Sequence, residues 1–415
     1  SLISKSNWKI GTKFELGLII GGFKSKEIHY QDVVLNTVEG TFNYLNGRLC
    51  IESVRGADAH NGKVYGNLAW EQNKIDANIS VEGLNLATLI KETNDLEGIF
   101  RGSMVVTGPV NDLTAVFKGE FQNITWQDKL IGNITGELIY AQNEIKIDAL
   151  DVDSTVGDFA VQGSVVLQDD FPLNLVVSSD NTNIDDFLKL LPVKLGVKLD
   201  GIGELKMAVN GPVSNANYSL TLNIDQPAIN NIVIQKAYLD LEGSLNQLQI
   251  RQFQLKNSEG EVQLAGTVTQ DNLDLVCKGV LNELQSLGLT FNGKIIEGKI
   301  DFEGRITGDF GKSVISAEVI GQSLAFGNLK YESLVARAIW DAPVCKIEEA
   351  ILEGEGGKVK IVGDIKKTDN WNLDLDVAVA DFPIKELLEI ANAASFDADG
   401  KLSGKIIIGG NLATP

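Results

Sequence analysis

Two histidines are the only imidazole side chains available for acid–base or metal chemistry in this chain of 415 residues. His29 and His60 stand in unrelated sequence surroundings. Asp58 and His60 could form a ligand pair, but the neighbouring sequence offers no third ligand of the kind that a zinc site needs. The histidines therefore predict neither a catalytic base nor a metal site.

Other reactive residue types also lack a chemical pattern. The glycine-rich run at 354–358 superficially resembles a phosphate loop, but it lacks the Gly-Lys-Ser/Thr ending. The acidic clusters do not match the spacing of a calcium loop. The three cysteines are far apart and form no CxxC pair, which argues against a metal site and a disulfide framework. We therefore expect no enzyme, no metal and no cofactor; the cysteines are Cys50, Cys277 and Cys345.

Charge and composition exclude further classes of protein. The formal net charge of −20 argues against binding nucleic acid or anionic membrane surfaces, because such partners require a surplus of Lys and Arg. No stretch approaches the run of about 18 apolar residues that predicts a membrane-spanning helix. The chain begins with Ser1 and stops within a repeated pattern at Pro415, so we expect a fragment of a longer array.

Two glycine motifs recur along the chain in fixed register. The first, Gly-x-φ-x-φ-x-φ-x-apolar-x-Gly with φ apolar or Gly, spans eleven residues and starts at residues 98, 201, 298 and 400. The second, Gly-x-apolar-x-apolar-x-Gly, starts 59 residues after the first at 157, 260 and 357 (157−98, 260−201, 357−298). Such periodicity predicts a tandem array. The expected repeats are residues 1–97 (lacking its first strand), 98–200, 201–297, 298–399 and the start of a fifth at 400–415.

Between the motifs, apolar and polar residues alternate with a period of two. In one such stretch Leu220, Leu222 and Ile224 interleave with polar residues. This alternation predicts strands with one dry face and one wet face. Turn signals such as Asn46-Gly47 recur about every ten residues and favour hairpins. We expect an all-β fold with roughly seven antiparallel strands in each repeat of about 100 residues.

One segment in each repeat has helical rather than strand periodicity. In 183–191 the apolar residues are spaced i, i+3, i+4 and i+7, and Asn183 is a suitable N-cap before two acids. Pro383 suits the first position of the last such helix. The apolar stripe of each helix should pack on the apolar side of the sheet. The expected helices are 84–92, 183–191, 281–289 and 384–394.

A strand with one apolar face must hide that face from water. A second sheet, closure into a barrel and stacking as a solenoid would each do so. An open groove that holds lipid is a fourth arrangement. The period of the sequence does not choose among them.

The chain resembles the TamB and AsmA-like family of diderm bacteria. The likeness is carried best by residues 200–255, where DGIGELKMAVNGP is followed by two alternating strands. It extends across the chain, most strongly from Gly98 onward. The resemblance implies an elongated antiparallel β-groove, also called a β-taco or repeating β-groove, built from tandem repeats with short helices.

The resemblance also implies a function. Such a protein would span the periplasm in the cell envelope, anchored to the inner membrane by a segment outside this chain. It would move phospholipid between the inner and outer membranes and contribute to outer-membrane biogenesis, with an outer-membrane β-barrel as a partner. The side chains implied to line the lipid groove are Phe100, Met104, Val106, Leu205, Met207, Val209, Leu220, Leu222, Ile300, Phe302, Ile306, Leu402, Ile406 and Ile408.

Two other functions are compatible with the same pattern. An exposed sheet edge could pair with strands of outer-membrane proteins, which would make the protein an envelope assembly factor. Alternatively, the array could be an inert surface scaffold whose apolar faces pack only against one another. Bound lipid would distinguish the conduit from the scaffold.

Overall fold

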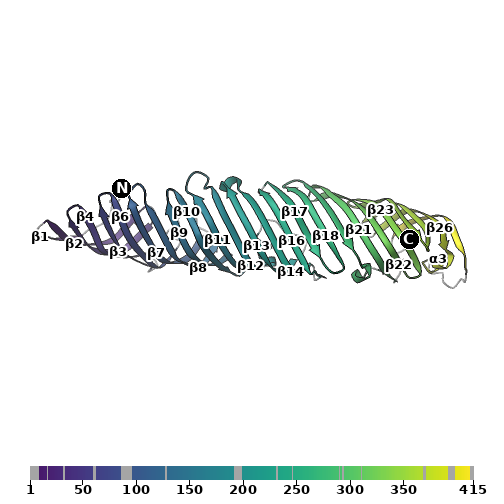
Figure 1. Ribbon diagram of the computed structural model, residues 1–415, viewed down its shortest axis with the longest axis horizontal. Coiled ribbons are helices and arrows are strands. Elements are labelled where there is room, and N and C mark those ends of the chain that lie inside the picture. Colours follow the sequence, from purple (N-terminus) through teal and green to yellow (C-terminus); the bar gives the residue numbers. More distant parts are fainter. Residues whose placement is uncertain are drawn as a thin grey trace. The chain divides into compact units, whose positions relative to one another are not determined.

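The protein is almost entirely β-structure, as Figure 1 shows for the computed structural model. Its described residues also include two short α-helices. This confirms the expected all-β class with short helices. The structure describes residues 9–15, 17–30, 33–58, 62–85, 96–126, 129–190, 199–229, 232–244, 246–288, 290–291, 294–309, 311–367, 371–390 and 398–411. Two compact units divide the chain, one made of 1–196 with 202–218 and the other of 197–201 with 219–415.

Unit 1 is a single antiparallel sheet in which each strand pairs with the next strand in sequence. Short hairpin connections favour this arrangement because they join neighbours. Its strands are β1 Lys9–Glu15, β2 Leu18–Tyr30, β3 Val33–Leu45, β4 Arg48–Ala57, β5 Lys63–Glu71, β6 Lys74–Asn85, β7 Leu96–Pro109, β8 Thr114–Trp126, β9 Lys129–Ala141, β10 Glu144–Ser154, β11 Gly157–Val166, β12 Leu173–Asn183 and β13 Leu199–Gly211.

Unit 2 follows the same plan. Two-residue strands pair locally at β15 and β20, so that β14 pairs with β16 and β19 with β21. Its strands are β14 Asn217–Ile229, β15 Ile232–Val233, β16 Lys236–Ser244, β17 Gln247–Lys256, β18 Gly260–Thr269, β19 Leu273–Leu281, β20 Thr290–Phe291, β21 Lys294–Asp309, β22 Lys312–Phe326, β23 Leu329–Asp341, β24 Val344–Gly354, β25 Gly357–Lys367, β26 Trp371–Pro383 and β27 Lys401–Asn411.

Neither sheet closes on itself. Among the described residues, no ladder joins β1 to β13 in unit 1 or β14 to β27 in unit 2. The accessible surface is 25598 Å², whereas a compact protein of this mass would expose about 16,000 Å². Much of the sheet surface is therefore open to solvent.

Successive connections alternate between the two edges of each sheet. On one edge, which we call the turn edge, three hairpins close through two residues that both have positive φ: Asn46-Gly47, Gln72-Asn73 and Gln142-Asn143. This confirms the turn expected at Asn46-Gly47. Such turns match the twist of the flanking strands. The opposite edge, which we call the helix edge, carries the α-helices of the described residues.

The helices partly confirm and partly correct the sequence expectation. Helix α2 spans Ile184–Leu190, and the Asn183 Oδ1 accepts the backbone N–H of Asp186 at 3.2 Å, as expected of its N-cap. Helix α3 spans Ile384–Ile390, but Pro383 is the last residue of β26 and precedes the helix instead of opening it.

The other two expected helices differ more. In 281–289 only one 3₁₀ turn forms, η2 at Leu284–Leu287, because β19 continues to Leu281 and Gly288 adopts a left-handed conformation that ends the turn. In 84–92 the first two residues belong to β6, and the remainder lies outside the described residues.

The same backbone irregularity recurs with the spacing of the glycine motifs. The ladders shift register after Ile147, Ile250 and Ile347, which are 103 and 97 residues apart (250−147, 347−250). Each isoleucine pairs with the last glycine of a second motif. At Gly363, φ is +139° and a Cβ would lie 2.1 Å from the Asp374 carbonyl oxygen, so no other residue fits. The last glycine of the second motif thus marks a β-bulge that recurs along the chain. The boundaries of the repeats remain a prediction.

Candidate functional site

Residues of one parity form a continuous apolar surface across each sheet, which we call the apolar face. Residues directly opposite in an antiparallel ladder share a face. In unit 1, Met104 pairs with Ile79 on β6 and with Phe117 on β8. In unit 2, Ile406 pairs with Val377 on β26, which pairs in turn with Ile361 on β25.

All fourteen groove-lining residues expected from the family resemblance lie on the side of their strands that is less exposed to solvent. Four are buried and the other ten are half-buried. The strand pairing places twelve of them on the apolar face. The other two, Leu220 and Leu222, are two residues apart in β14 and therefore lie on the same side of that strand. The buried residues are Phe100, Leu205, Val209 and Leu222; the half-buried ones are Met104, Val106, Met207, Leu220, Ile300, Phe302, Ile306, Leu402, Ile406 and Ile408.

Aromatic rings dominate one part of the apolar face in unit 1. Phe100 is buried beside Leu84, and its ring centroid lies 4.8 Å from that of Phe117 and 4.9 Å from that of Phe121. Tilted pairs at such distances add to the free energy gained from burial. This cluster gives unit 1 a local core on the apolar face.

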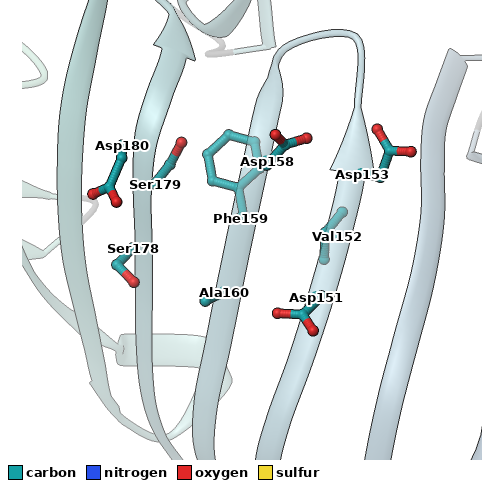
Figure 2. Close-up of a pocket in the computed structure, with 9 residues that line it drawn as sticks. All are labelled: Asp151, Val152, Asp153, Asp158, Phe159, Ala160, Ser178, Ser179 and Asp180. Atoms are coloured by element: carbon teal, nitrogen blue, oxygen red, sulfur yellow. The ribbon is translucent and has the colours of Figure 1, made fainter.

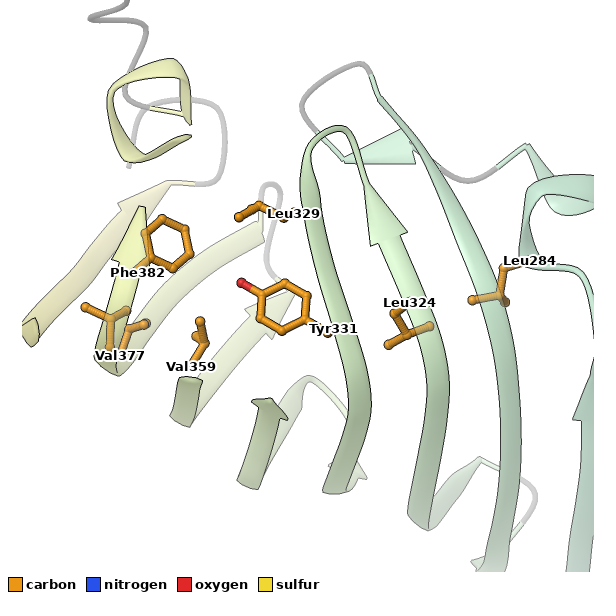
Figure 3. Packing of buried hydrophobic residues seen from close by; sticks show 8 residues of the cluster. Leu284, Leu324, Leu329, Tyr331, Val359, Val377 and Phe382 are labelled. Atoms are coloured by element: carbon orange, nitrogen blue, oxygen red, sulfur yellow. The ribbon is translucent and has the colours of Figure 1, made fainter. Parts of the chain in front are cut away.

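Aliphatic side chains form most of the corresponding cluster in unit 2. Figure 3 shows side chains from several strands pointing to one side of the sheet. Four of the expected lining residues pack against this cluster: Ile300, Leu402, Ile406 and Ile408. Its buried members are Leu284, Leu324, Leu329, Tyr331, Val359, Val377, Val379 and Phe382.

The opposite face of the sheets, which we call the wet face, is polar and carries cross-strand ion pairs. Arg305 donates to both carboxylate oxygens of Asp274 at 2.7 Å, which lowers the pKa of Asp274 and raises that of Arg305. Lys360 donates to Glu349 at 2.6 Å and lowers the pKa of that carboxyl group. Apolar residues of this parity are left in water, as Ile407 illustrates with 78% exposure next to half-buried Ile406.

Helix α3 packs on the apolar side at the helix edge. Leu387 contacts the apolar cluster of unit 2. Glu386 is buried, accepts a hydrogen bond from the Asn328 amide at 3.0 Å, and lies 3.8 Å from the Lys294 ammonium. A buried carboxylate needs such partners to offset its lost hydration. The helix therefore contacts the β22–β23 turn through the hydrogen bond to Asn328 and β21 through the ion pair with Lys294. Apolar side chains of the helix pack beneath these polar contacts.

Tyr331 is the polar group deepest in that cluster. It is 2% exposed, and its hydroxyl donates to the Gly356 carbonyl oxygen at 3.4 Å. Burial, together with the nearby charge of Glu386, raises its pKa to about 12. The tyrosine stays neutral over the whole physiological range.

Aromatic residues recur at the turn edge of the apolar face. In four hairpins the residue two positions before the turn is aromatic: Tyr44, Trp70, Tyr140 and Trp340. Their cross-strand partners are apolar, which places them on the apolar face. The Tyr140 hydroxyl donates to Asn143 in the turn at 3.3 Å. The rings thus lie where the apolar face meets water.

A lysine joins this aromatic row in unit 2. Lys367 and Trp371 are directly opposite each other at the turn edge, on the parity of Ile365 and Leu373. The Lys367 ammonium lies 5.4 Å from the centre of the Trp371 ring, whose centroid is 6.0 Å from that of Trp340. The three side chains combine one cation with two indoles beside an apolar surface.

Figure 2 shows a pocket of about 340 Å³ over β10, β11 and β12. Four carboxylates line it, from Asp151, Asp153, Asp158 and Asp180. That of Asp158 accepts a hydrogen bond from the Asn181 amide at 2.8 Å. The described residues contain no group of three or more His, Cys, Asp or Glu side chains suited to a metal ion. We interpret this pocket as part of the wet face.

Asp58, one member of the pair considered as metal ligands, has a local structural role. Its carboxylate accepts the backbone N–H groups of Gly62 at 2.6 Å and Asn85 at 3.2 Å. His60 lies outside the described residues. Burial raises the pKa of the Cys277 and Cys345 thiols, which disfavours the reactive thiolate form.

Sequence reasoning missed Glu386, Lys367 and the aromatic row. The row has a detectable signal, because an aromatic residue occupies the same position before four of the tight turns. The hydrogen bond between Asn328 and Glu386 has no detectable signal in the sequence, since the two residues are 58 positions apart.

In the part of the chain that the structure describes, no helix has the length and apolar character needed to cross a membrane. No known protein family matches the chain, and no curated protein sequence or solved structure is similar to it. The resemblance to the TamB and AsmA-like family therefore remains a prediction based on its motifs.

Proposed function

We propose that the apolar face binds the acyl chains of phospholipid and that the protein is a section of a conduit for lipid. The observation that carries this proposal is an apolar face that runs without interruption across an open sheet in each unit. Its side chains are mostly aliphatic and half-buried, with no second sheet over them among the described residues.

Acyl chains match this surface physically. Each methylene group removed from water contributes about 0.8 kcal/mol, without a preferred direction. A row of Leu, Ile and Val on successive strands, about 4.8 Å apart, offers contact that continues as a chain moves. A polar side chain within the row would interrupt that contact.

The wider setting is proposed from the family resemblance alone. The conduit would lie in the periplasm of a diderm bacterium, anchored to the inner membrane by a segment outside this chain. It would move phospholipid between the two membranes, with an outer-membrane β-barrel as a partner and a role in outer-membrane biogenesis.

Two adjacent isoleucines provide a matched test. Ile406 lies on the apolar face and Ile407 on the wet face of the same strand. We expect Ile406→Asp to lower the amount of phospholipid that co-purifies with the full chain, because an unpaired carboxylate on the acyl path is unfavourable. Ile407→Asp should leave the amount unchanged. Lipid bound per protein is measured by mass spectrometry after detergent-free purification.

Unit 1 contains the equivalent pair Met104 and Val105. Thermal melting of every variant separates a blocked face from an unfolded one. If Ile406→Asp unfolds the protein, a photoreactive side chain at 406 or 407 in the otherwise unchanged chain replaces it. Crosslinking of lipid at 407 only, or no lipid in the wild type, would contradict the proposal and favour the inert scaffold.

A further inference from the structure

The turn edge and the helix edge of the apolar face in unit 2 differ in polarity. At the helix edge, α3 packs Leu387 over the apolar cluster and fastens itself through Glu386. At the turn edge, Trp371 is 38% exposed and Lys367 is exposed. A molecule lying on this face would therefore meet an apolar boundary at one end and a wet, cationic boundary at the other.

We propose that Lys367, Trp340 and Trp371 form a headgroup station for a glycerophospholipid. This inference rests on the proposed binding of acyl chains. The phosphate would accept a hydrogen bond from the Lys367 ammonium, and the glycerol ester region would lie against the two indoles. The acyl chains would extend from there toward the helix edge, over the parity of Leu373 and Leu375.

The chemistry of these residues fits such a ligand. Indole rings prefer the boundary between apolar and aqueous surroundings because they combine an apolar body with one N–H donor. A lysine binds phosphate as a point charge. Charge complementarity is local, since the protein as a whole carries a net charge of −20 and would otherwise repel an anion.

The backbone around the station is held by neighbouring strands. The Lys367 N–H donates to the Pro343 carbonyl oxygen at 2.9 Å, which ties β25 to the turn that follows Trp340. Trp340 pairs with Cys345 on β24, and Cys345 pairs with Ile365 on β25. The two indoles and the ammonium therefore come from β23, β25 and β26, with β24 lying between β23 and β25.

Unit 1 offers an internal control for the cation. The positions 200 residues earlier hold Tyr140, Leu167 and Phe171, so the aromatic character is kept while the lysine is replaced by leucine. Val165 lies opposite Leu173 in unit 1 as Ile365 lies opposite Leu373 in unit 2, but the ladder continues to Lys367 and Trp371 only in unit 2.

The test measures binding of defined lipids to the full chain. We expect Lys367→Gln to weaken binding of phosphatidylglycerol about five- to tenfold, the loss of one charge-assisted hydrogen bond. Binding of diacylglycerol with the same chains, which lacks the phosphate, should not change. Lys366→Gln removes the same charge from the wet face and should have no effect. Inorganic phosphate alone should not compete.

Each outcome decides between sources of the effect. Equal losses in Lys366→Gln and Lys367→Gln, or an equal loss for diacylglycerol, would overturn the station while leaving the lipid-binding face intact. Competition by inorganic phosphate would indicate an anion site that is not specific for lipid. If wild-type protein binds neither lipid, the proposed function fails before the station is tested.

A second measurement reports orientation without changing Lys367. In a variant whose Trp8, Trp70 and Trp126 are replaced by phenylalanine, emission comes from Trp340 and Trp371 alone. A nitroxide on the lipid headgroup should quench this emission more strongly than a nitroxide at the end of an acyl chain. The reverse order would contradict the proposed direction of the bound lipid.

Discussion

The end of β12 with helix α2 and the end of β26 with helix α3 are the same device, 200 residues apart, fastened in different ways. In unit 1, Asn183 caps α2 through a local hydrogen bond. In unit 2, buried Glu386 joins α3 to Asn328, which is distant in sequence. The strands before both helices carry the same alternation and end at equivalent residues, Asn183 and Pro383. Alternation therefore builds the sheet in both units, whereas each edge element is secured by its own contacts.

The strongest test of what the units share is to remove the glycine that both require. We expect Gly163→Ala and Gly363→Ala each to lower the free energy of unfolding by about 3 kcal/mol or more, because strained backbone and overlap combine. A Cβ would lie 1.9 Å from the Asn174 carbonyl oxygen in the first case and 2.1 Å from that of Asp374 in the second.

Urea denaturation measures the loss, and Gly404→Ala is the control, because a Cβ there meets no atom within 4 Å. If only one of the two substitutions lowered the free energy of unfolding, the two units would not share the requirement for a glycine at this position.

The difference between the helices predicts unequal effects. Glu386→Ala should destabilise α3 by about 2–4 kcal/mol, because it removes a charged hydrogen bond and leaves its partners unsatisfied. Asn183→Ala should cost α2 about 1 kcal/mol, as is typical of an N-cap. Hydrogen exchange of the helix amides provides the comparison. Similar losses of protection in both helices would show that the buried carboxylate adds nothing to local capping.

Tyr331 gives unit 2 a titratable probe of its buried cluster. Its pKa of about 12 lies above the usual tyrosine pKa of 10.0, so the neutral form is stabilised by folding. That contribution is fully present below pH 10 and is lost as the pH rises from 10 toward 12. Absorbance of tyrosinate should show the late titration of Tyr331, and Tyr331→Phe should remove that signal. Titration of that group near pH 10 would mean that water reaches the cluster.

The smallest expected effect is a gain in stability. Thr182 is fully buried, and its hydroxyl has no hydrogen-bond partner in the described part of the chain. The position 200 residues later holds Phe382, which belongs to the apolar cluster. We expect Thr182→Val to raise the free energy of unfolding by about 1 kcal/mol, since it removes an unsatisfied polar group without changing the shape. A lower melting temperature would show that the hydroxyl is bonded after all.

Strand parity was predictable from the sequence because it depends on alternating side chains. The fourteen expected lining residues, from Phe100 to Ile408, accordingly all lie on the less exposed side of their strands. The helix expected at 281–289 was wrong, because pairing of β19 with β21 extends the strand through Leu281. Long-range contacts left no periodic trace: neither Glu386 with Asn328 nor Trp340 beside Trp371 could be inferred from spacing.

The pairing of each strand with its sequence neighbour has a consequence for how the protein folds. Most ladders close a loop of a few residues, so little chain entropy is lost before contacts form. Folding can then begin at any hairpin and propagate strand by strand in both directions, as in a one-dimensional chain of coupled units. Each new strand takes its register from the one before it, and the bulges opposite the motif glycines would halt a slipped register before it spread.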